Sequence, residues 1–395
     1  MIQQTQTKQL LKGWKKEKLG ESGFEILQSK INKFNGKKDY LSTKSVQDLE
    51  IKKIECEITF EKRPLRANMQ PIINSTWFAK MKNTIKVLCF NEKNVGDIER
   101  YILSTGFAGI SSHSIIPEYL KYYFVSDIFN IQKDKFSTGT TQVAINNDGI
   151  KQIEILYPES KQEQTLIVQE IETQFTRLDE TVKFLKSVKD KFQVYRKAVL
   201  KKAFENGIET QLGKAFEIIM GQSPPSRYYN EEGRGLPFFQ GKKEFRDRFP
   251  KISIWTEKYT KFANGGDLLV SIRAPIGPCN IAPEKCAIGR GIAAIKAKNG
   301  TESLLLFYLI NYKEQELDSK GTGTTFKAIS KGNLNSFIIK LPKKEDWEKV
   351  VQLIESKFSV IDKVEETVNQ SLIKAEQLRK SILKIAFEGR LIKND

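Results

Sequence analysis

The segments RKAVLKKAFE at residues 196–205 and RKSILKIAFE at residues 379–388 decide how this chain of 395 residues is organised. Seven of the ten positions are identical, and each segment closes a stretch without proline or glycine. Apolar residues recur every three or four positions along both stretches, which is typical of amphipathic α-helices. The sequence therefore predicts two long helices with related C-terminal ends.

A second repeat precedes each of these helical stretches. STGTT at residues 137–141 is followed by Pro158, and GTGTT at residues 321–325 is followed by Pro342, 184 positions later in each case. The chain thus carries one unit twice. Two related units can form a pseudo-two-fold arrangement, which suits a partner with two half-sites.

The helical stretches have apolar seams of the coiled-coil type. Along residues 161–205 and 347–388 the apolar steps of three and four lie close to a 3.5-residue period. A narrow stripe cannot be buried alone, so we expect the helices to pack on each other in antiparallel orientation as a coiled-coil spacer. The residues expected in this seam or against a partner are Phe175, Leu178, Leu185, Phe192, Phe358, Ile361, Val368 and Leu378.

The composition is that of a globular protein with more than one core. A chain of 395 residues with 39% apolar residues is long enough for two or more domains. No apolar run approaches the ~20 residues of a membrane span, and the N-terminus resembles no signal peptide, so a cytoplasmic location is expected. Four cysteines without a Cys-x-x-Cys spacing and the single His113 favour reduced thiols over a metal site.

The net charge of +17 lies mainly outside the helical stretches. Residues 1–160 and 206–340 together carry +13 of it, and the two helical stretches are nearly balanced. Excess positive charge on globular segments indicates a polyanionic partner, and nucleic acid is the most common one.

Residues for catalysis are largely missing. The chain has no Gly-x-x-x-x-Gly-Lys-Ser/Thr loop, no His-Glu-x-x-His and no Asn/Asp-Pro-Pro-aromatic motif of amino-methyltransferases. One histidine excludes most schemes that pair histidine with serine or cysteine. We therefore expect a binding protein, with no catalytic, cofactor-binding or metal-ligating residues of its own.

Several segments combine basic, amide and hydroxyl side chains with glycine, as DNA-reading loops do. Arginine and glutamine can pair with guanine and adenine edges, whereas lysine, serine and threonine hold phosphates. In the second unit the candidates are Gln222, Ser223, Gln240, Lys242, Lys243, Arg246, Arg273, Arg290, Thr322 and Thr324. In the first unit, where YLSTK at residues 40–44 parallels FFQGK at residues 238–242, they are Ser42, Thr43, Lys44, Arg63, Arg66, Asn68, Gln70 and Lys80.

The second unit strongly resembles a known recognition domain. GQSPP at residues 221–225, LPFFQGK at 236–242, GDLLVSIRAPIG at 266–277 and IGRGIAAI at 288–295 together resemble a target recognition domain of the specificity subunit of type I restriction–modification systems. With the repeated Thr-Gly-Thr-Thr turns and helix ends, the resemblance covers nearly the whole chain. The first unit departs from the pattern, since it lacks the Gly-Gln-Ser-Pro loop.

The resemblance implies a non-catalytic subunit of a larger assembly. Each recognition domain would read one half of an asymmetric, two-part site in double-stranded DNA. The helices would fix the gap between the halves and dock two modification subunits. Those partners would carry S-adenosylmethionine and methylate adenine N6, and restriction subunits would cleave DNA with ATP and Mg. This chain would bind no cofactor.

The predicted fold class is α+β, with two mixed α/β target recognition domains, two long antiparallel helices as a coiled-coil spacer, and a pseudo-two-fold internal repeat. The expected domains are 1–160 and 207–342 for recognition, and 161–206 and 343–395 for the helices. Two alternatives stay open. One is a self-contained DNA-modifying enzyme, and the other is a structural coiled-coil adaptor whose basic domains bind proteins.

Overall fold

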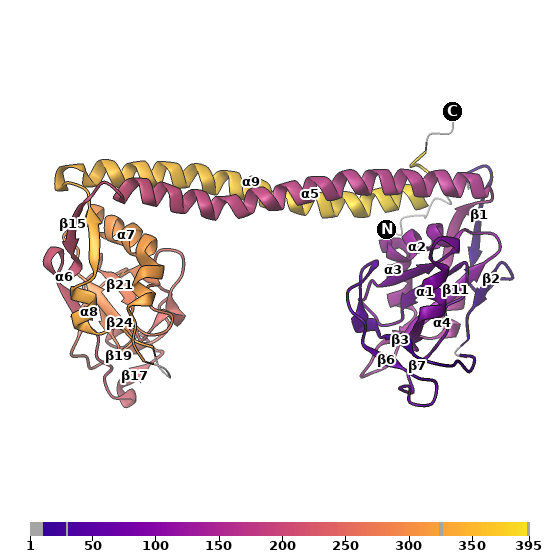
Figure 1. Cartoon of the computed structure of the whole chain (residues 1–395), viewed down its shortest axis with the longest axis horizontal. Helices are drawn as coiled ribbons and strands as arrows, with labels where there is room; N and C mark the ends of the chain where they lie inside the picture. Colours follow the sequence, from indigo (N-terminus) through magenta and orange to yellow (C-terminus); the bar gives the residue numbers. More distant parts are fainter. Residues whose placement is uncertain (1–10, 29–30, 324–326, 393–395) are drawn as a thin grey trace, which may run out of the picture. The chain divides into compact units, whose positions relative to one another are not determined.

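The computed structural model describes residues 11–28, 31–323 and 327–392, and the chain divides into two compact units. Unit 1 combines residues 1–185 with residues 370–395, and unit 2 comprises residues 186–369. Each unit holds a globular domain of mixed α/β structure and one part of each long helix, α5 (Lys161–Phe204) and α9 (Trp347–Phe387) (Figure 1). The two long helices expected from the sequence are thus present.

The globular part of unit 1 is organised around two four-stranded sheets. One has the order β2-β11-β8-β9, and the other has the order β6-β3-β10-β7 with β3 and β10 parallel. Helix α2 packs on β8 and β9, and β1 pairs with β14 just before α5 begins. The elements are β1 (Trp14–Lys18), β2 (Phe24–Ile26), β3 (Lys38–Leu41), β4 (Val46–Gln47), β5 (Glu50–Ile51), β6 (Cys56–Ile58), β7 (Ala67–Met69), β8 (Ser75–Ala79), β9 (Val87–Phe90), α1 (Val95–Arg100), β10 (Tyr101–Ser104), β11 (Phe107–Ser112), α2 (Pro117–Val125), α3 (Asp127–Lys135), β12 (Ser137–Thr138), β13 (Ala144–Ile145), α4 (Asn147–Lys151) and β14 (Glu154–Pro158).

The globular part of unit 2 contains a four-stranded sheet, β16-β24-β21-β22, and a five-stranded sheet, β17-β19-β18-β23-β20. Strands β18 and β23 are parallel, and β15 pairs with β25 beside the helices. Helix α7 packs on β21 and β22. The elements are β15 (Ile208–Gln211), α6 (Leu212–Ala215), β16 (Ile218–Met220), β17 (Tyr229–Asn230), β18 (Leu236–Phe239), β19 (Trp255–Thr256), β20 (Phe262–Ala263), β21 (Leu268–Ser271), β22 (Cys279–Ile281), β23 (Cys286–Ile288), β24 (Ile292–Ile295), α7 (Gly300–Ser319), α8 (Lys331–Asn335) and β25 (Ile338–Leu341).

The two globular parts repeat one strand order. The sheet β2-β11-β8-β9 corresponds to β16-β24-β21-β22, and β6-β3-β10-β7 corresponds to β19-β18-β23-β20. Equivalent backbone hydrogen bonds support the alignment, since Lys80 N donates to Gly106 O and Ile272 N donates to Gly291 O, both at 2.9 Å. The internal repeat therefore extends from the helix ends into the globular parts, and it assigns an equivalent loop in unit 2 to each loop of unit 1.

Within each unit the two helix segments run antiparallel and are joined by the first arginine of the repeated helix ends. In unit 2, Arg196 Nη2 donates to Asp362 Oδ1 at 2.7 Å, and its guanidinium lies 5.2 Å from the Phe358 ring centroid. In unit 1, Arg379 pairs with Asp179 and lies 4.6 Å from the Phe175 ring centroid. The repeated arginine thus pairs with an aspartate and stacks on a phenylalanine ring in both units.

The structure corrects the predicted seam at Leu378. Leu378 is 49% exposed, although the periodicity placed it in the seam. Ala375 and Ile382 are buried, and the guanidinium of Arg379, which lies between them in the sequence, stacks on the Phe175 ring. The other predicted seam residues are buried or half-buried, namely Phe175, Leu178, Leu185, Phe192, Phe358, Ile361 and Val368.

The phenylalanine of each repeated helix end is inserted into a globular core. Phe387 is 2% exposed and packs edge-on against Tyr119 and Tyr123 of α2. Phe204 is 1% exposed and stacks on Tyr312 of α7. The helix ends are therefore anchors, each of which fixes one helix to the globular part of its own unit.

Among the residues that the structure describes, no helix is long and apolar enough to cross a membrane. Within the same residues, no three histidine, cysteine or acidic side chains gather as a metal site would require.

Candidate nucleic-acid interface

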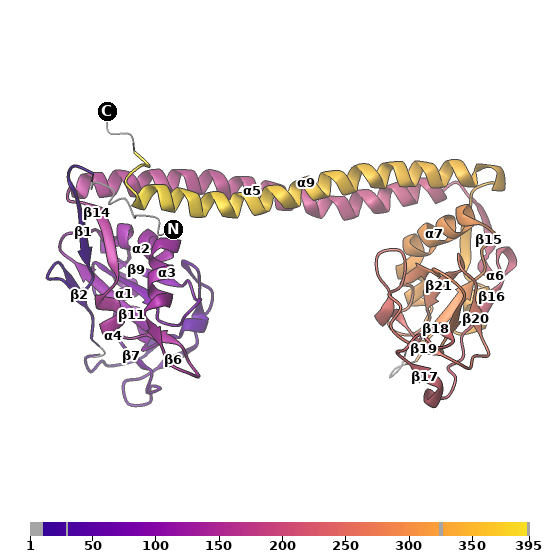
Figure 2. The same cartoon turned by 180° about the vertical axis from the view of Figure 1, so that it is seen from behind.

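Figures 1 and 2 label β17 and β19 at the end of unit 2 remote from its helix segments, and three predicted readers lie on loops of this unit. Gln222 follows β16, Gln240 follows β18, and Arg290 lies in the turn between β23 and β24. All three side chains are exposed. Segments that are far apart in the sequence are thus brought to one surface.

Short backbone contacts join these loops into one cluster. Gln222 N donates to Ile288 O at 2.9 Å, and Gly289 N donates to Phe239 O at 2.8 Å. Ser223 Oγ accepts a hydrogen bond from Arg290 N at 3.1 Å. The exposed Arg273 follows Ile272, whose N–H donates to Gly291 O. Four predicted readers, Gln222, Gln240, Arg273 and Arg290, therefore belong to one continuous surface.

Glycine is required where these loops meet. A Cβ on Gly291 would lie 2.1 Å from Gln240 O, and a Cβ on Gly221 would lie 2.2 Å from Gly289 O. Any side chain at these two positions would push the loops apart. The glycines therefore serve the contact between loops and set the positions of the neighbouring Gln222 and Arg290.

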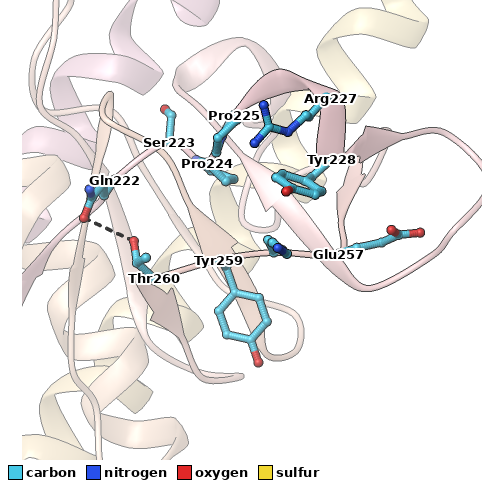
Figure 3. Close-up of a pocket in the computed structure, with 10 residues that line it drawn as sticks. Gln222, Ser223, Pro224, Pro225, Arg227, Tyr228, Glu257, Tyr259 and Thr260 are labelled. Atoms are coloured by element: carbon cyan, nitrogen blue, oxygen red, sulfur yellow. Dashed lines mark hydrogen bonds between the residues drawn. The ribbon is translucent and has the colours of Figure 1, made fainter.

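A cavity of about 530 Å³ opens beside this cluster (Figure 3). It lies between the loop of residues 222–228 and the β19–β20 loop of residues 257–260. Thr260 Oγ1 donates to Gln222 Oε1 at 3.1 Å, which turns the amide nitrogen of Gln222 away from Thr260. Gln222 is thereby oriented to offer a donor to an acceptor such as purine N7.

The cavity carries positive charge next to aromatic rings. Lys258 Nζ lies 4.7 Å from the Tyr228 ring centroid, and the Arg227 guanidinium lies 5.0 Å from it. Side-chain hydrogen bonds from Arg227, and to a smaller extent from Lys258, to the phenol oxygen lower the pKa of Tyr228. Two cations held together in this way can bind a phosphate, and the rings can stack on a sugar or base.

The other predicted residues of unit 2 that the structure describes lie on neighbouring segments. The Arg246 guanidinium donates to Lys243 O and Phe245 O, so it stabilises its own loop, and Lys242 and Lys243 are exposed on the same loop. The backbone of Thr322 pairs with Ala328, close to Arg273. Thr324 lies outside the described residues.

In unit 1 several predicted readers are engaged within the domain. Ser42 Oγ caps the turn of residues 43–45 and donates to Glu55 Oε2 at 2.7 Å. Gln70 Nε2 donates to Ile98 O at 2.9 Å, and Lys86 Nζ donates to Thr43 O at 2.6 Å. The contacts of Ser42 and Gln70 use the side-chain groups that the sequence suggested for DNA, whereas the contact at Thr43 is made by its backbone carbonyl.

The remaining predicted residues of unit 1 lie in the turn after β3 and around the β6–β7 and β8–β9 loops. Lys44 and Arg66 are exposed, and Arg63 and Asn68 are half-buried. Lys80 is half-buried, and burial lowers its pKa. By the strand alignment Lys80 corresponds to Ile272, so Met81, which is 49% exposed, stands where unit 2 has Arg273.

The structure adds residues that the sequence did not single out. Arg227, Tyr228, Lys258 and Thr260 line the cavity of unit 2, and Leu65 at the β6–β7 loop of unit 1 is 98% exposed. The sequence offered one signal for the exposure of Leu65. This residue follows Pro64 and lies between Arg63 and Arg66, and a leucine in such a setting is unlike a core residue.

Comparison with known proteins gives consistent relatives. Residues 208–376 match the model of the type I restriction modification DNA specificity domain. The chain is 30% identical over 308 residues to the type I restriction enzyme MjaX specificity subunit of Methanocaldococcus jannaschii, a match that covers 71% of this chain and 69% of that protein. It is 22% identical over 307 residues to the StySPI specificity subunit of Salmonella potsdam, covering 70% and 66% respectively.

Two solved structures resemble the whole chain. A chain from a study of complex assembly and conformational transition in the type I restriction–modification system has a TM-score of 0.82 and 28% identity, with coverage of 97% of this chain and 100% of that one. The HsdS subunit from Thermoanaerobacter tengcongensis has a TM-score of 0.68 and 28% identity, with coverage of 98% and 99%.

Proposed function

This chain belongs to the specificity subunits of type I restriction–modification systems, and we propose that its two globular parts read the two halves of one bipartite DNA site. As a member of this family it recognises DNA. The division of that task between the units is our proposal, and so is the assignment of individual residues.

The observation that carries the proposal is the cluster of unit 2. Gln222, Gln240 and Arg290 stand on loops joined by backbone hydrogen bonds, and the cavity beside them holds Arg227 and Lys258. Amide and guanidinium groups read base edges, while the cations hold phosphates. This surface offers both kinds of contact within one domain.

Unit 1 supports a second reader because it repeats the same strand order with different loops. Equivalent sheets would present their loops to DNA in the same manner, whereas different side chains would prefer different bases. Met81 replaces Arg273, and Leu65 has no counterpart of its kind in the shorter β19–β20 loop. An asymmetric two-part site follows from two readers of this kind.

The long helices are proposed to form a coiled-coil spacer, with a pseudo-two-fold relation between the units, that sets the gap between the half-sites and docks two modification subunits. Apolar side chains on α5 and α9 support docking because they remain exposed after the helix segments have paired. Phe184 is 66% exposed, Val194 67%, Val360 59% and Ile373 60%. We propose that these exposed apolar side chains contribute to the protein interface with the modification subunits. Replacing these residues with serine should abolish capture of the modification subunit in a pull-down, and unchanged capture would exclude the helices as its docking site.

The partners, and not this chain, are proposed to supply catalysis. The modification subunits would bind S-adenosylmethionine and methylate adenine, and the restriction subunits would use ATP and Mg for cleavage. The role of this chain would be to hold the DNA in one register so that the partners meet their target base.

The deciding experiment combines the host methylome with footprinting of the assembled complex. The methylated motif should be bipartite, and the complex should protect two half-sites with a constant gap. The double variant Gln222→Ala/Arg273→Ala should weaken binding to one half about tenfold to a hundredfold, the size of losing one or two base contacts. The preference for the other half should persist.

A matched control comes from the same unit. Lys331→Ala removes an exposed cation from α8 without touching the reading loops, and it should leave both preferences intact. Equal loss of both half-site preferences in the double variant would show that Gln222 and Arg273 are structural. A complex that protects no DNA would favour the structural adaptor.

A further inference from the structure

The β6–β7 loop of unit 1 displays a leucine to solvent almost completely. Leu65 is 98% exposed, and among the described residues the next most exposed large apolar side chain is Ile131 at 68%. Single exposed apolar residues are normal on protein surfaces, but the exposed fraction of Leu65 sets it apart from the other exposed apolar side chains that the structure describes. The loop therefore calls for an explanation beyond ordinary surface composition.

The backbone holds this leucine at the corner of a braced turn. Ala67 N donates to Pro64 O at 2.8 Å, which places Leu65 and Arg66 at the centre of the turn. Arg66 O in turn accepts hydrogen bonds from Thr105 N at 2.8 Å and Asn68 N at 3.0 Å. Proline fixes its own φ, so the turn loses little entropy when it binds.

The start of the loop is braced as well. The Arg63 guanidinium lies 4.2 Å from the Phe60 ring centroid and donates to Phe60 O. Phe60 packs edge-on against Phe34 at 5.8 Å between ring centroids. Leu65 is thus mounted on a supported scaffold, unlike a side chain at the tip of a loose loop.

Basic residues surround the leucine, and the loop lies at the reading end of the domain. Lys62 and Arg66 are exposed, and Arg63 lies on the other side of Pro64. Figures 1 and 2 place β6 and β7 at the end of unit 1 remote from its helix segments. The equivalent loop of unit 2, between β19 and β20, lines the cavity beside Gln222.

We propose that Leu65 is a wedge that enters the DNA base stack in the half-site read by unit 1, with Arg66 and Lys62 on the flanking phosphates. The inference rests on the proposed function and adds how the contact is made. Apolar side chains that enter between base steps partly unstack them and bend the duplex, so the sequence is read through its deformability. A leucine between cations, fixed before binding, has the properties that such a step requires.

The test uses the full chain assembled with its modification subunits and a duplex carrying the bipartite motif found in the host methylome. 2-Aminopurine replaces one base at a time through both half-sites, avoiding the base that is methylated. The half-site of unit 1 is the one whose preference survives Gln222→Ala/Arg273→Ala. A wedge there should raise fluorescence at one base step.

Leu65→Ala should abolish that signal and weaken binding to this half-site about tenfold, because one base-level contact is lost. Leu65→Met, which keeps an apolar side chain of similar volume, should retain the signal. Ile131→Ala, on α3 of the same unit, is the matched control and should change neither quantity. Folding is not at risk, since a side chain that is 98% exposed contributes little to the core.

Three results would overturn the wedge. The first is a bound bipartite site without unstacking in the half read by unit 1, and the second is unstacking that persists in Leu65→Ala. In both cases the proposed function stands while the wedge falls. The third is loss of the modification subunits from the Leu65→Ala complex, which would make Leu65 a protein contact. A complex that binds no bipartite site would instead refute the proposed function itself.

Discussion

The β6–β7 loop of unit 1 and the β19–β20 loop of unit 2 connect equivalent strands but present different side chains. The first presents Leu65 on a turn fixed by Pro64, and the second presents Lys258 and Thr260 against an open cavity. The strands on either side keep the same order and the same parallel partner. Specificity can therefore change in the loops while the sheets that support them stay constant.

The comparison separates two kinds of repeated position. Arg196 and Arg379 each pair with an aspartate and lie on a phenylalanine ring, and Phe204 and Phe387 are each buried against tyrosine in their own unit. In contrast, Met81 stands where unit 2 has Arg273. The arginines and phenylalanines that hold the helix segments in place therefore have the same residue type in both units. Met81 and Arg273, on the surface that we propose for reading DNA, share only their place in the fold.

The largest effect is expected at the helix anchors. Phe387→Ala should destabilise unit 1 and Phe204→Ala should destabilise unit 2, each by about 3–5 kcal/mol, because a large cavity opens in a packed core. Hydrogen exchange measured by mass spectrometry along a urea series would report each unit separately. Each variant should accelerate exchange mainly in the unit that holds its phenylalanine.

The control for the anchors is Val194→Ala, because Val194 is on α5 but 67% exposed. It should change stability by less than about 0.5 kcal/mol, as surface substitutions usually do. Equal destabilisation of both units by one anchor variant would contradict the view that each helix end belongs to a single unit.

The helices and the repeat could be predicted from the sequence because both are local properties. Periodicity and the absence of proline and glycine mark the helices, and the strand alignment agrees with the pairing of YLSTK at residues 40–44 with FFQGK at residues 238–242. The place of Arg379 in the seam could not be predicted from such local patterns. A cation enters an apolar seam only because Phe175 and Asp179 of the facing helix accept it.

The loop cluster that we propose as a reading surface follows the sequence pattern more closely in unit 2 than in unit 1. Gln222, Gln240 and Arg290 stand next to glycines, and loops rich in glycine can approach one another closely. The Gln70 amide, by contrast, is taken up by Ile98 O, and no local pattern shows that α1 passes there. Leu65 was missed because a leucine in sequence indicates a core, and its exposure depends on how the loop is braced.

A second prediction concerns Lys133 of unit 1, the only lysine that is buried among the residues that the structure describes. Lys133 is 1% exposed and donates to Thr84 O, and the Thr-Gly-Thr-Thr repeat aligns it with Leu317, which is fully buried in unit 2. Burial lowers the pKa of Lys133 to about 8. Lys133→Leu should therefore stabilise unit 1 at neutral pH, by about 3 kcal/mol at most, because a desolvated charge is removed.

The pH dependence of the stability of unit 1 tests the same prediction independently. Below about pH 8 both the folded and the unfolded chain hold the proton on Lys133, and the cost of burying the charge is fully present. Between about pH 8 and 10.5 only the unfolded chain holds it, so the stability of unit 1 should rise with pH in that window. Urea unfolding of Lys133→Leu should lack this rise, and a rise of unchanged size would assign it to other groups.

The smallest effect is expected at the paired arginines, where the two units differ in detail. Arg196 reaches Asp362 at 2.7 Å and Glu365 at 3.0 Å, whereas Arg379 pairs with Asp179. These groups are partly exposed, so Arg379→Gln should cost about 0.5 kcal/mol and Arg196→Gln about 1 kcal/mol.

Double-mutant cycles with Asp179→Asn and Asp362→Asn, followed by hydrogen exchange in the helix segments, would measure each coupling. Both couplings should shrink as salt is raised from 0.05 to about 0.5 M, because exposed charges are screened. Couplings of equal size that do not depend on salt would mean that the stacking on Phe175 and Phe358, and not the ion pairs, holds the segments together.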